Sequence, residues 1–179
     1  ISSGGLGDTV LFSYVVENFT ALAKSNERVV LLCNRGSEKM GFLFPPLVEI
    51  LSIDFQRLRK NLFYRHSIMT SLFEANFRLV INTDHLRHPD MDEALARACV
   101  ASQAIAMTPR YMAKYSRQID ANSKIYDRLF DSGPPRKDKI RRWLEFAAWL
   151  SPSTPQLQTL NLPKDRIPPL SREPKPLVV

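Results

Sequence analysis

The chain opens with Ile-Ser-Ser-Gly-Gly-Leu-Gly-Asp-Thr-Val-Leu-Phe (residues 1–12), in which a glycine-rich loop leads into a helical pattern. From Thr9 onward the apolar side chains recur at the spacing that is typical of a helix with one buried face. This face consists of Leu11, Val15, Phe19 and Leu22. We interpret the start of the loop as the end of a strand. Most of that strand would lie before Ile1, so we expect the sequence to be a fragment of a longer chain.

Strand and helix patterns alternate after this opening. Short apolar or alternating runs predict strands at residues 29–33, 48–53, 79–81 and 103–107. Amphipathic stretches predict helices near residues 56–75, 91–100 and 140–150, with a short helix near 125–130. The side chains expected on inner helix faces include Leu58, Leu62, Met69, Phe73, Ile140, Leu144 and Ala147, and Trp143 and Trp149 are expected in the core. This order predicts an α/β fold with a Rossmann-like parallel sheet sandwiched between helices.

Composition divides the chain into a domain at residues 1–150 and a linker at 151–179. The linker holds seven of the 13 prolines: Pro152, Pro155, Pro163, Pro168, Pro169, Pro174 and Pro176. Such a composition is typical of an extended linker. The final residues, from Pro176 to Val179, resemble the start of a strand, so we expect a second domain to follow.

The charge of the chain is unevenly distributed. The formal net charge is +7, and residues 1–56 hold 4 Lys and Arg against 6 Asp and Glu, which leaves 21 against 12 for the remainder. Such a basic surface favours an anionic partner such as a phosphate or a membrane surface, although it also fits a merely solvated face. Nucleic-acid binding is not supported, because the aromatic residues fall on expected core faces rather than among the basic ones.

The two cysteines and the hydropathy pattern bear on location. Cys33 lies within an apolar run and Cys99 is far from it in sequence, so neither matches a metal-binding spacing. We interpret Cys33 as a buried free thiol and expect a reduced, cytoplasmic protein. No run of apolar residues is long enough for a membrane span, and no signal peptide is visible.

The glycine loop permits several interpretations. Gly4, Gly5 and Gly7 would allow a ligand to approach the backbone at the start of a helix, where free amide groups favour anions. A dinucleotide fingerprint would need glycine at Val10 and an acidic residue near Asn34, so NAD binding is disfavoured. The phosphate-loop pattern fails because no Gly-Lys-Ser/Thr follows. Asp8 fits equally well as a helix N-cap and as a catalytic base.

Polar side chains follow the other expected strands. Ligands bind at the carboxyl ends of strands in such sheets, which selects the loops at residues 2–8, 34–41 and 82–90. Asp84, His85, Arg87 and His88 lie in the last of these, but no third ligand completes a metal site for the two histidines. Two groups of basic residues are candidates for anion binding: the first is more simply a solvated helix face than a phosphate site, and the second is better placed for an anionic lipid acceptor. They are Arg57, Arg59, Lys60, Arg65 and His66 on one helix, and Arg110, Lys114 and Arg117 after a strand.

Three features resemble glycosyltransferase family nine, the lipopolysaccharide heptosyltransferases. Residues 4–12 (Gly-Gly-Leu-Gly-Asp-Thr-Val-Leu-Phe) resemble the family's opening loop and helix. Residues 77–82 (Phe-Arg-Leu-Val-Ile-Asn) are similar to its Tyr-Asp-x-Val-Ile-Asp strand, although Asn82 stands where an acidic residue is frequent. The Trp-rich helix before the proline-rich linker is the third feature. Residues 110–138 fit no part of the family pattern.

The resemblance implies the N-terminal half of a GT-B enzyme, in which two Rossmann-like domains face a cleft. This half would bind the acceptor, a lipopolysaccharide-type or other anionic lipid or glycan, and a C-terminal domain beyond Val179 would bind the nucleotide-sugar. Asp8 would be the general base of an inverting transfer of a sugar such as a heptose. The residues that we expect to bind the acceptor are Gly5, Gly7, Thr9, Asp84, His85 and Arg110.

Neither a cofactor nor a metal is expected for such a transfer. A peripheral contact with the inner membrane face would bring the enzyme to a lipid-linked acceptor. The alternative interpretation is a non-catalytic ligand-binding module of the same fold, in which Asp8 only caps its helix. The domain alone is expected to be inactive, because the donor site would lie elsewhere.

Overall fold

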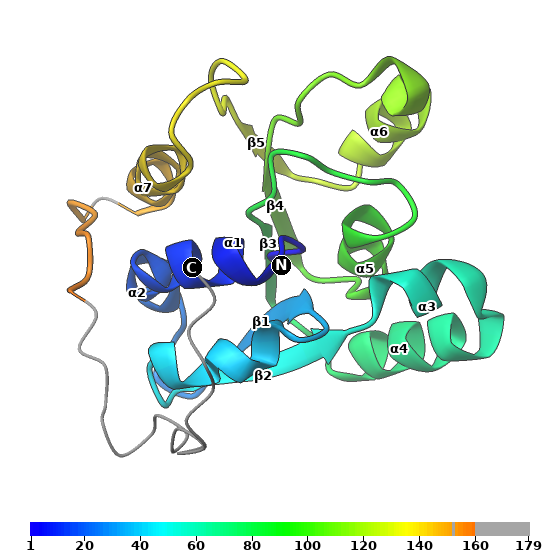
Figure 1. The fold of residues 1–179 in the computed structure, drawn as a ribbon, viewed down its shortest axis with the longest axis horizontal. Helices are drawn as coiled ribbons and strands as arrows, with labels where there is room; N and C mark the ends of the chain where they lie inside the picture. The colour runs from blue at the N-terminus through cyan, green and yellow to red at the C-terminus, as the bar shows by residue number, and fades with distance from the viewer. Residues whose placement is uncertain (152, 160–179) are drawn as a thin grey trace, which may run out of the picture.

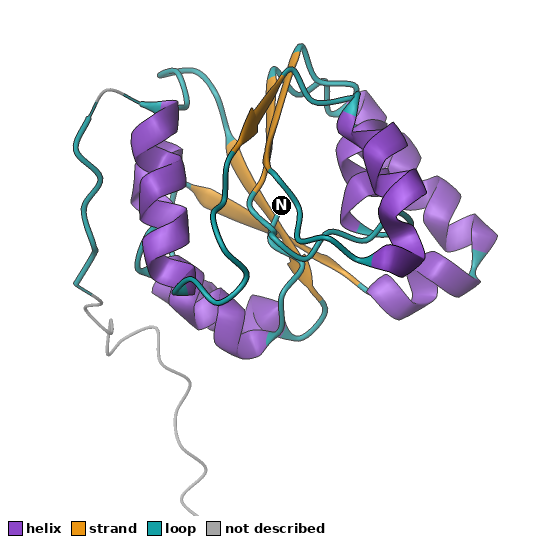
Figure 2. Cartoon of the chain, turned by 90° about the horizontal axis from the view of Figure 1, so that it is seen from above, coloured by secondary structure: helices purple, strands orange, loops and turns teal. Residues whose placement is uncertain are grey.

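The computed structural model describes residues 1–151 and 153–159, which form an α/β fold with helices on both faces of parallel strands (Figures 1 and 2). The strands are β1 (Val29–Asn34), β2 (Val48–Ile53), β3 (Leu79–Asn82), β4 (Gln103–Met107) and β5 (Arg128–Phe130). The α-helices are α1 (Leu6–Ser13), α2 (Val16–Thr20), α3 (Phe55–Lys60), α4 (Leu62–Glu74), α5 (Asp92–Ala98), α6 (Ser116–Ser123) and α7 (Lys139–Leu150). The short 3₁₀ helices are η1 (Ser37–Leu43) and η2 (Ala113–Tyr115).

The strands form two parallel ladders, β1–β2 and β3–β4–β5, and the first residues of the chain join them. The amide of Ser2 donates to the carbonyl of Leu32 in β1 at 2.9 Å, and the amide of Thr83 donates to the carbonyl of Ile1 at 3.1 Å. The spatial order is therefore β2, β1, Ile1–Ser2, β3, β4 and β5. This is the order of a doubly wound Rossmann-like sheet in which Ile1–Ser2 occupies the place of the first strand.

Two apolar cores lie on the two faces of these strands. Neighbouring residues along a strand contribute to different cores because successive side chains point to opposite faces. Leu31 and Ile105 pack with the first core, and Leu32 and Ala104 pack with the second. The first core is centred on Phe12, Val15, Val16, Met107, Trp143 and Phe146, and the second on Ile53, Phe55, Leu58, Leu72, Leu95 and Tyr126. The expected sandwich of helices around a parallel sheet is confirmed.

The first expected helix is broken. Helix α1 ends at Ser13, whose hydroxyl donates to the carbonyl of Val10 at 2.7 Å, and such bonding back to the helix backbone competes with its regular pattern. Helix α2 begins afresh at Val16. The inner face is consequently shifted from the expected one: Phe12 and Val16 are buried, whereas Leu11 is 36% exposed.

The long helix expected near residues 56–75 is also two helices. Asn61 adopts an extended conformation, ends α3 and caps α4, with its side-chain oxygen accepting from the amide of Tyr64 at 2.8 Å. The expected inner face was partly wrong. Leu58 is fully buried, but Leu62 and Phe73 are 79% and 61% exposed, because the break rotates α4 relative to α3.

The short helix expected near residues 125–130 is wrong. Residues 128–130 form β5, which pairs in parallel with β4, and the helix α6 lies before it. Trp143 is buried as expected, whereas Trp149 is 36% exposed and carries the guanidinium of Arg128 over its ring at 4.0 Å. Both cysteines are free and buried, which confirms the interpretation of Cys33.

The linker expected at residues 151–179 lies mostly outside the described residues. Of its described part, the amide of Gln158 donates to the carbonyl of Tyr14, so this segment runs back along the first helices. Within residues 1–151 and 153–159, none of the helices has the length and apolar character needed to cross a bilayer.

Candidate functional site

The candidate site lies at the carboxyl ends of the strands, where the direction of winding reverses. In the spatial order above, the reversal falls between Ile1–Ser2 and β3. Ligands of doubly wound sheets bind in the crevice at this point. The loops that leave the two elements are residues 3–5, which lead into α1, and residues 83–90. They carry most of the polar residues singled out in the sequence.

Asp8 stands in the first turn of α1 and not at its cap. The helix begins at Leu6 with Gly5 as N-cap, and no side chain caps it. The interpretation of Asp8 as an N-cap was therefore wrong, because the glycine loop enters the helix three residues earlier than the sequence pattern indicated. The carboxylate is 34% exposed and makes no capping bond, so solvent reaches it.

Gly4 is packed against Asp8. A Cβ placed on Gly4 would lie 2.5 Å from the Cβ and 2.8 Å from the Cγ of Asp8, closer than side chains can approach, whereas Gly5 and Gly7 have open space around them. The glycine loop therefore has two different roles. Gly4 lets the backbone fold over the Asp8 side chain, and Gly5 and Gly7 leave uncovered backbone at the helix start.

Lys139 pairs with Asp8 from the opposite end of the sequence. Helix α7 begins at Lys139, after Asp138 caps it by accepting from the amide of Arg141 at 2.8 Å. The Lys139 ammonium lies 2.7 Å from the Asp8 carboxylate and 5.3 Å from the ring centre of Trp143. Both members of the pair are about one-third exposed, so it is accessible to a ligand rather than sealed in the core.

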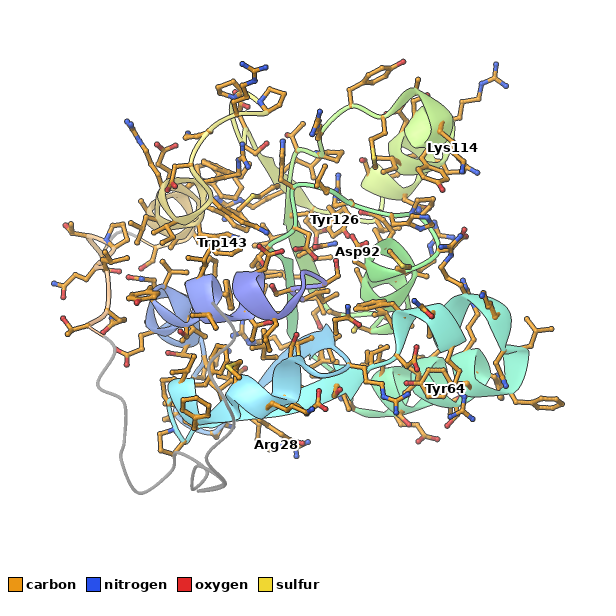
Figure 3. All side chains as sticks on the ribbon, viewed as in Figure 1. Arg28, Tyr64, Asp92, Lys114, Tyr126 and Trp143 are labelled. Atoms are coloured by element: carbon orange, nitrogen blue, oxygen red, sulfur yellow. The ribbon has the colours of Figure 1, made fainter. Side chains whose placement is uncertain are left out.

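Trp143 fixes α7 to the loop after β3. Its side chain is 1% exposed and its indole nitrogen donates to the carbonyl of Thr83 at 2.9 Å. Figure 3 shows Trp143 pointing from α7 into the centre of the molecule, and its ring packs edge-on against Phe12 of α1. The Asp8–Lys139 pair thus lies at a junction of three elements that one tryptophan holds together.

Asp84 lies beneath the glycine loop. It is 6% exposed, and its carboxylate accepts from the amide of Ser3 at 2.6 Å. Burial raises the pKa of Asp84, and the Ser3 amide and the Lys139 ammonium oppose that rise. The side chain therefore anchors the backbone that leads to Asp8, while a direct contact with an acceptor stays a prediction.

The hydrogen bonds around His85 favour one tautomer of its neutral imidazole. The Ser132 hydroxyl donates to the carbonyl of Thr108 at 2.8 Å, so its oxygen accepts from Nδ1 of His85 at 3.0 Å. The proton is then on Nδ1, and Nε2 is a buried acceptor without a hydrogen-bond partner among the described residues. Burial lowers the pKa of His85, and the guanidinium of Arg142 lowers it further.

The remaining predicted site residues lie around this centre. The Thr9 side chain is buried and its hydroxyl donates to the carbonyl of Gly5, so it faces the helix backbone. The Arg110 side chain is exposed, and its amide donates to the carbonyl of His85 at 2.8 Å, which ties the two loops together. The structure therefore brings the loops of Asp8, Asp84, His85 and Arg110 to one edge of the sheet.

A buried polar network supports the loop after β3 from below. Asn82 donates to Asp92 and to the hydroxyl of Tyr126, both at 3.1 Å, and Tyr126 donates to Glu93 at 3.2 Å. Glu93 also pairs with Arg87 at 2.8 Å, and the side chains of both are fully buried. Asp92 and Tyr126 lie close together near the centre of the molecule in Figure 3, where both bond to Asn82. Arg87, which the sequence placed among ligand-edge residues, is therefore structural.

Sequence reasoning missed Lys139, Ser132 and Arg142. Arg142 is 5% exposed and donates to the carbonyls of Ser132 and Pro134, so it holds the loop after β5 against α7. Only the position of Lys139 at the start of a helix could have drawn attention to it, and nothing local links it to residue 8. In the described part of the chain, no group of His, Cys, Asp and Glu residues is arranged to hold a metal ion.

No protein-family model, curated protein or solved structure matches this chain.

Proposed function

We propose that the chain is the acceptor-binding half of an inverting sugar transferase, with Asp8 as general base. The observation that carries the proposal is the accessible Asp8 carboxylate at the winding reversal of a doubly wound sheet, paired with Lys139 and backed by Gly4. The resemblance of residues 4–12 to family nine supports the same assignment. A second Rossmann-like domain in a GT-B arrangement would supply the donor.

In the proposed reaction, the Asp8 carboxylate takes the proton from an acceptor hydroxyl. The hydroxyl oxygen forms a bond to the anomeric carbon of the donor sugar on the face opposite the leaving group. The bond from that carbon to the phosphate oxygen breaks, and the nucleoside diphosphate leaves with the electron pair. General-base assistance of this kind contributes roughly 10²–10⁴-fold to the rate.

Lys139 has a place in this scheme. An exposed ammonium–carboxylate pair is weak, worth about 0–1 kcal/mol, so an anionic acceptor can draw the Lys139 ammonium away from Asp8 at low cost. A phosphate or carboxylate on the acceptor would then pair with Lys139 while its hydroxyl meets Asp8. This exchange accounts for a base that is ion-paired in the free protein.

A non-catalytic binding module is the second candidate. The Asp8–Lys139 ion pair fits this candidate, because a pair whose only role is to hold α1 against α7 needs no catalytic carboxylate. The two candidates differ in what the carboxylate must do: a module needs only the contact, whereas a transferase needs a proton acceptor.

Replacing Asp8 by asparagine separates these candidates. In the protein that carries this domain together with a donor-binding half, we expect Asp8→Asn to reduce kcat by roughly 10²–10⁴-fold, because an amide cannot take the proton. Turnover is measured with nucleotide-sugars and a glycan acceptor. Glu49→Gln is the matched control, since it removes the exposed Arg28–Glu49 pair away from the crevice and should leave turnover unchanged. Near-normal turnover of Asp8→Asn would favour the module.

We further propose that the enzyme is cytoplasmic and docks peripherally on an anionic membrane. The support comes from the corner between α3 and α4, where Leu62 and Phe63 are 79% and 90% exposed. The segment between Asp54 and Glu74 carries four basic residues, Arg57, Arg59, Lys60 and Arg65, and no acidic one. Exposed apolar side chains flanked by basic ones suit the interface of an anionic bilayer, where each Lys or Arg contributes about 1 kcal/mol.

A further inference from the structure

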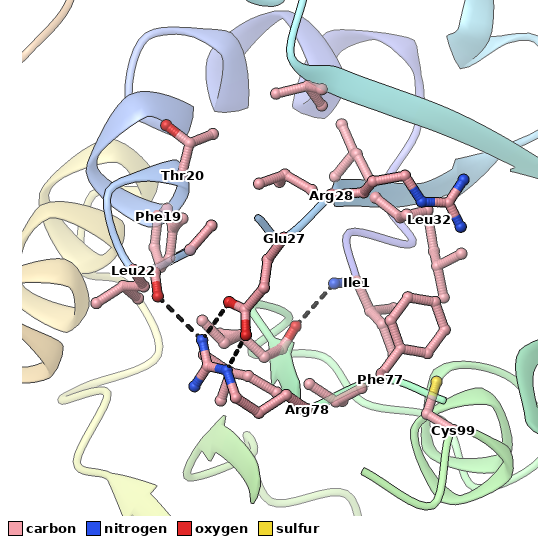
Figure 4. A pocket seen from close by; sticks show the side chains of 18 of the residues that line it. Ile1, Phe19, Thr20, Leu22, Glu27, Arg28, Leu32, Phe77, Arg78 and Cys99 are labelled. Atoms are coloured by element: carbon pink, nitrogen blue, oxygen red, sulfur yellow. Dashed lines mark hydrogen bonds and ion pairs between the residues drawn. The ribbon is translucent and has the colours of Figure 1, made fainter. Parts of the chain in front are cut away.

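A cavity of about 300 Å³ continues the line of Ile1–Ser2 between β1 and β3, away from the candidate site (Figure 4). Its apolar walls come from both strands and from both helical layers. Phe19 and Leu22 line it on the side of α2, and Phe77 and Cys99 line it on the side of α5. The ion pair of Glu27 with Arg78 lies at its rim, and Arg78 also donates to the carbonyl of Leu22.

The amide and carbonyl groups of every second residue in β1 point toward this cavity. Directly after β1, the amide of Arg35 donates to the carbonyl of Ile53 in β2, whereas the carbonyl of Leu32 within β1 accepts from the amide of Ser2. Because parallel strands bond through alternate residues on each side, the amides of Val30 and Leu32 point away from β2 and into the cavity.

The backbone of β3 does the same from the opposite wall. The carbonyl of Arg78 accepts from Gln103 of β4, whereas the carbonyl of Ile81 accepts from the Ile1 amino group at 2.7 Å. By the same alternation, the amides of Leu79 and Ile81 point into the cavity. Two strands thus present donors and acceptors to one space, as two neighbours of a missing central strand would.

The Ile1 amino group stands at the head of the cavity and is itself buried. Burial lowers the pKa of this amine, because a charged group is costly in an apolar surrounding. A peptide bond at this position would keep the hydrogen bond to Ile81 and remove the charge. A separate peptide would instead place a carboxylate beside the amine.

We propose that this cavity is a binding slot for an apolar peptide segment in extended conformation, joined to the amino group of Ile1 and running parallel to β1 and β3. Continuing the observed register gives the pairing. The carbonyl of the first residue before Ile1 accepts from the amide of Leu32, and the carbonyl of the second accepts from the amide of Ile81. The carbonyl of the third accepts from the amide of Val30, and that of the fourth from the amide of Leu79. A segment flanked on both faces by helices has to be apolar along its whole length.

The proposal is tested by adding residues ahead of Ile1. A Val-Val-Ile-Val extension is compared with Gly-Ser-Gly-Ser and with the chain that begins at Ile1. We expect the apolar extension to raise Tm by on the order of 10 °C over the Gly-Ser control, because it buries its side chains and completes the sheet. Equal Tm values for the two extensions would overturn the proposal.

Amide hydrogen exchange tests the register independently of stability. The apolar extension should slow exchange at Val30, Leu32, Leu79 and Ile81 by about 100-fold relative to the Gly-Ser control, since these amides gain partners. A two-residue Ile-Val extension should protect only Leu32 and Ile81. The amides of Leu31 and Val80 point to β2 and β4 and serve as internal controls. Equal exchange at Val30 and Leu79 in all forms would refute the pairing.

Discussion

At the scale of single residues, the orientation of Asp8 depends on the absence of a side chain at Gly4. The loop carries three glycines, and only Gly4 has the Asp8 side chain in the space that a Cβ would occupy. Because the Asp8 Cβ is fixed to the helix backbone, rotation of the carboxylate cannot relieve the contact of 2.5 Å between this Cβ and a Cβ at Gly4. A methyl group at Gly4 must therefore displace the start of α1.

We accordingly expect Gly4→Ala to lower the free energy of unfolding by about 1–3 kcal/mol, the usual cost of overpacking. It should also separate Asp8 from Lys139 and reduce turnover as Asp8→Asn does. Chemical denaturation measures the stability, and a crystal structure of the variant shows the ion pair. Gly7→Ala is the matched control, since Gly7 has open space and lies within α1, where alanine stabilises by about 0.5–1 kcal/mol. Equal stability of the two variants would contradict this account of Gly4.

At the scale of secondary-structure elements, the break at Asn61 changes what α4 presents to solvent. An uninterrupted helix would have carried Leu62 inward with Leu58, as the sequence pattern indicated. The side-chain cap at Asn61 instead restarts the helix, so Leu62 and Phe63 are exposed at a corner that Lys60 and Arg65 flank in sequence. The Asn61 cap, which interrupts a longer helix, thus exposes the surface that we propose for membrane docking.

Replacing Phe63 by serine tests this assignment. We expect Phe63→Ser to weaken binding to vesicles of phosphatidylcholine and anionic phosphatidylglycerol by roughly 10-fold, since burial of a phenylalanine side chain contributes about 1.5–3 kcal/mol. Cosedimentation at low and high salt measures it, and salt should weaken the binding of the unmodified chain. Phe73→Ser removes another exposed phenylalanine, near the C-terminal end of α4 and away from Lys60 and Arg65 in sequence, and should leave binding unchanged. Binding that ignores salt, lipid charge and Phe63 would disprove the docking surface.

At the scale of the whole molecule, the buried acidic residues make stability depend on pH. Burial, reinforced by Asp84, raises the pKa of Asp92 from 3.8 to about 8. The folded state then holds a proton that the unfolded chain has already released. The free energy of unfolding therefore falls as the pH rises from about 4 to about 8, by up to about 1.4 kcal/mol per pH unit from this group.

Asp92→Asn should remove this contribution. We expect the free energy of unfolding of Asp92→Asn to vary less steeply with pH between 5 and 8 than that of the unmodified chain. The variant should also lose a constant amount of stability at every pH, because one oxygen acceptor is replaced. Asp84 and Glu93, whose pKa values burial also raises, remain in both proteins, so the difference reports Asp92 together with its electrostatic coupling to these two groups. Urea titrations at several pH values measure it, with the exposed neighbour Asp90→Asn as control. Parallel pH profiles for Asp92→Asn and the unmodified chain would show that Asp92 is ionised in the fold.

The sequence by itself determined the class of fold and four of the five strands in the described part of the chain. The strands at residues 48–53 and 103–107 have the predicted bounds, because an alternating run in the first and an apolar run in the second each leave a local signal of a strand. The glycine loop likewise pointed to Asp8, because close backbone approach requires glycine. Buried Trp143 followed from its place on an amphipathic helix.

Only the tertiary structure decided which residues and strands pair with one another. Lys139 meets Asp8 across 131 positions of sequence, and β5 is a strand because β4 lies beside it. The network of Asn82, Asp92 and Tyr126 likewise joins three separate elements. Hydrophobic periodicity records which side of an element is buried, but an ion pair or a strand pairing depends on where two elements come to rest against each other. That placement is fixed by packing over the whole sheet, and no local pattern encodes it.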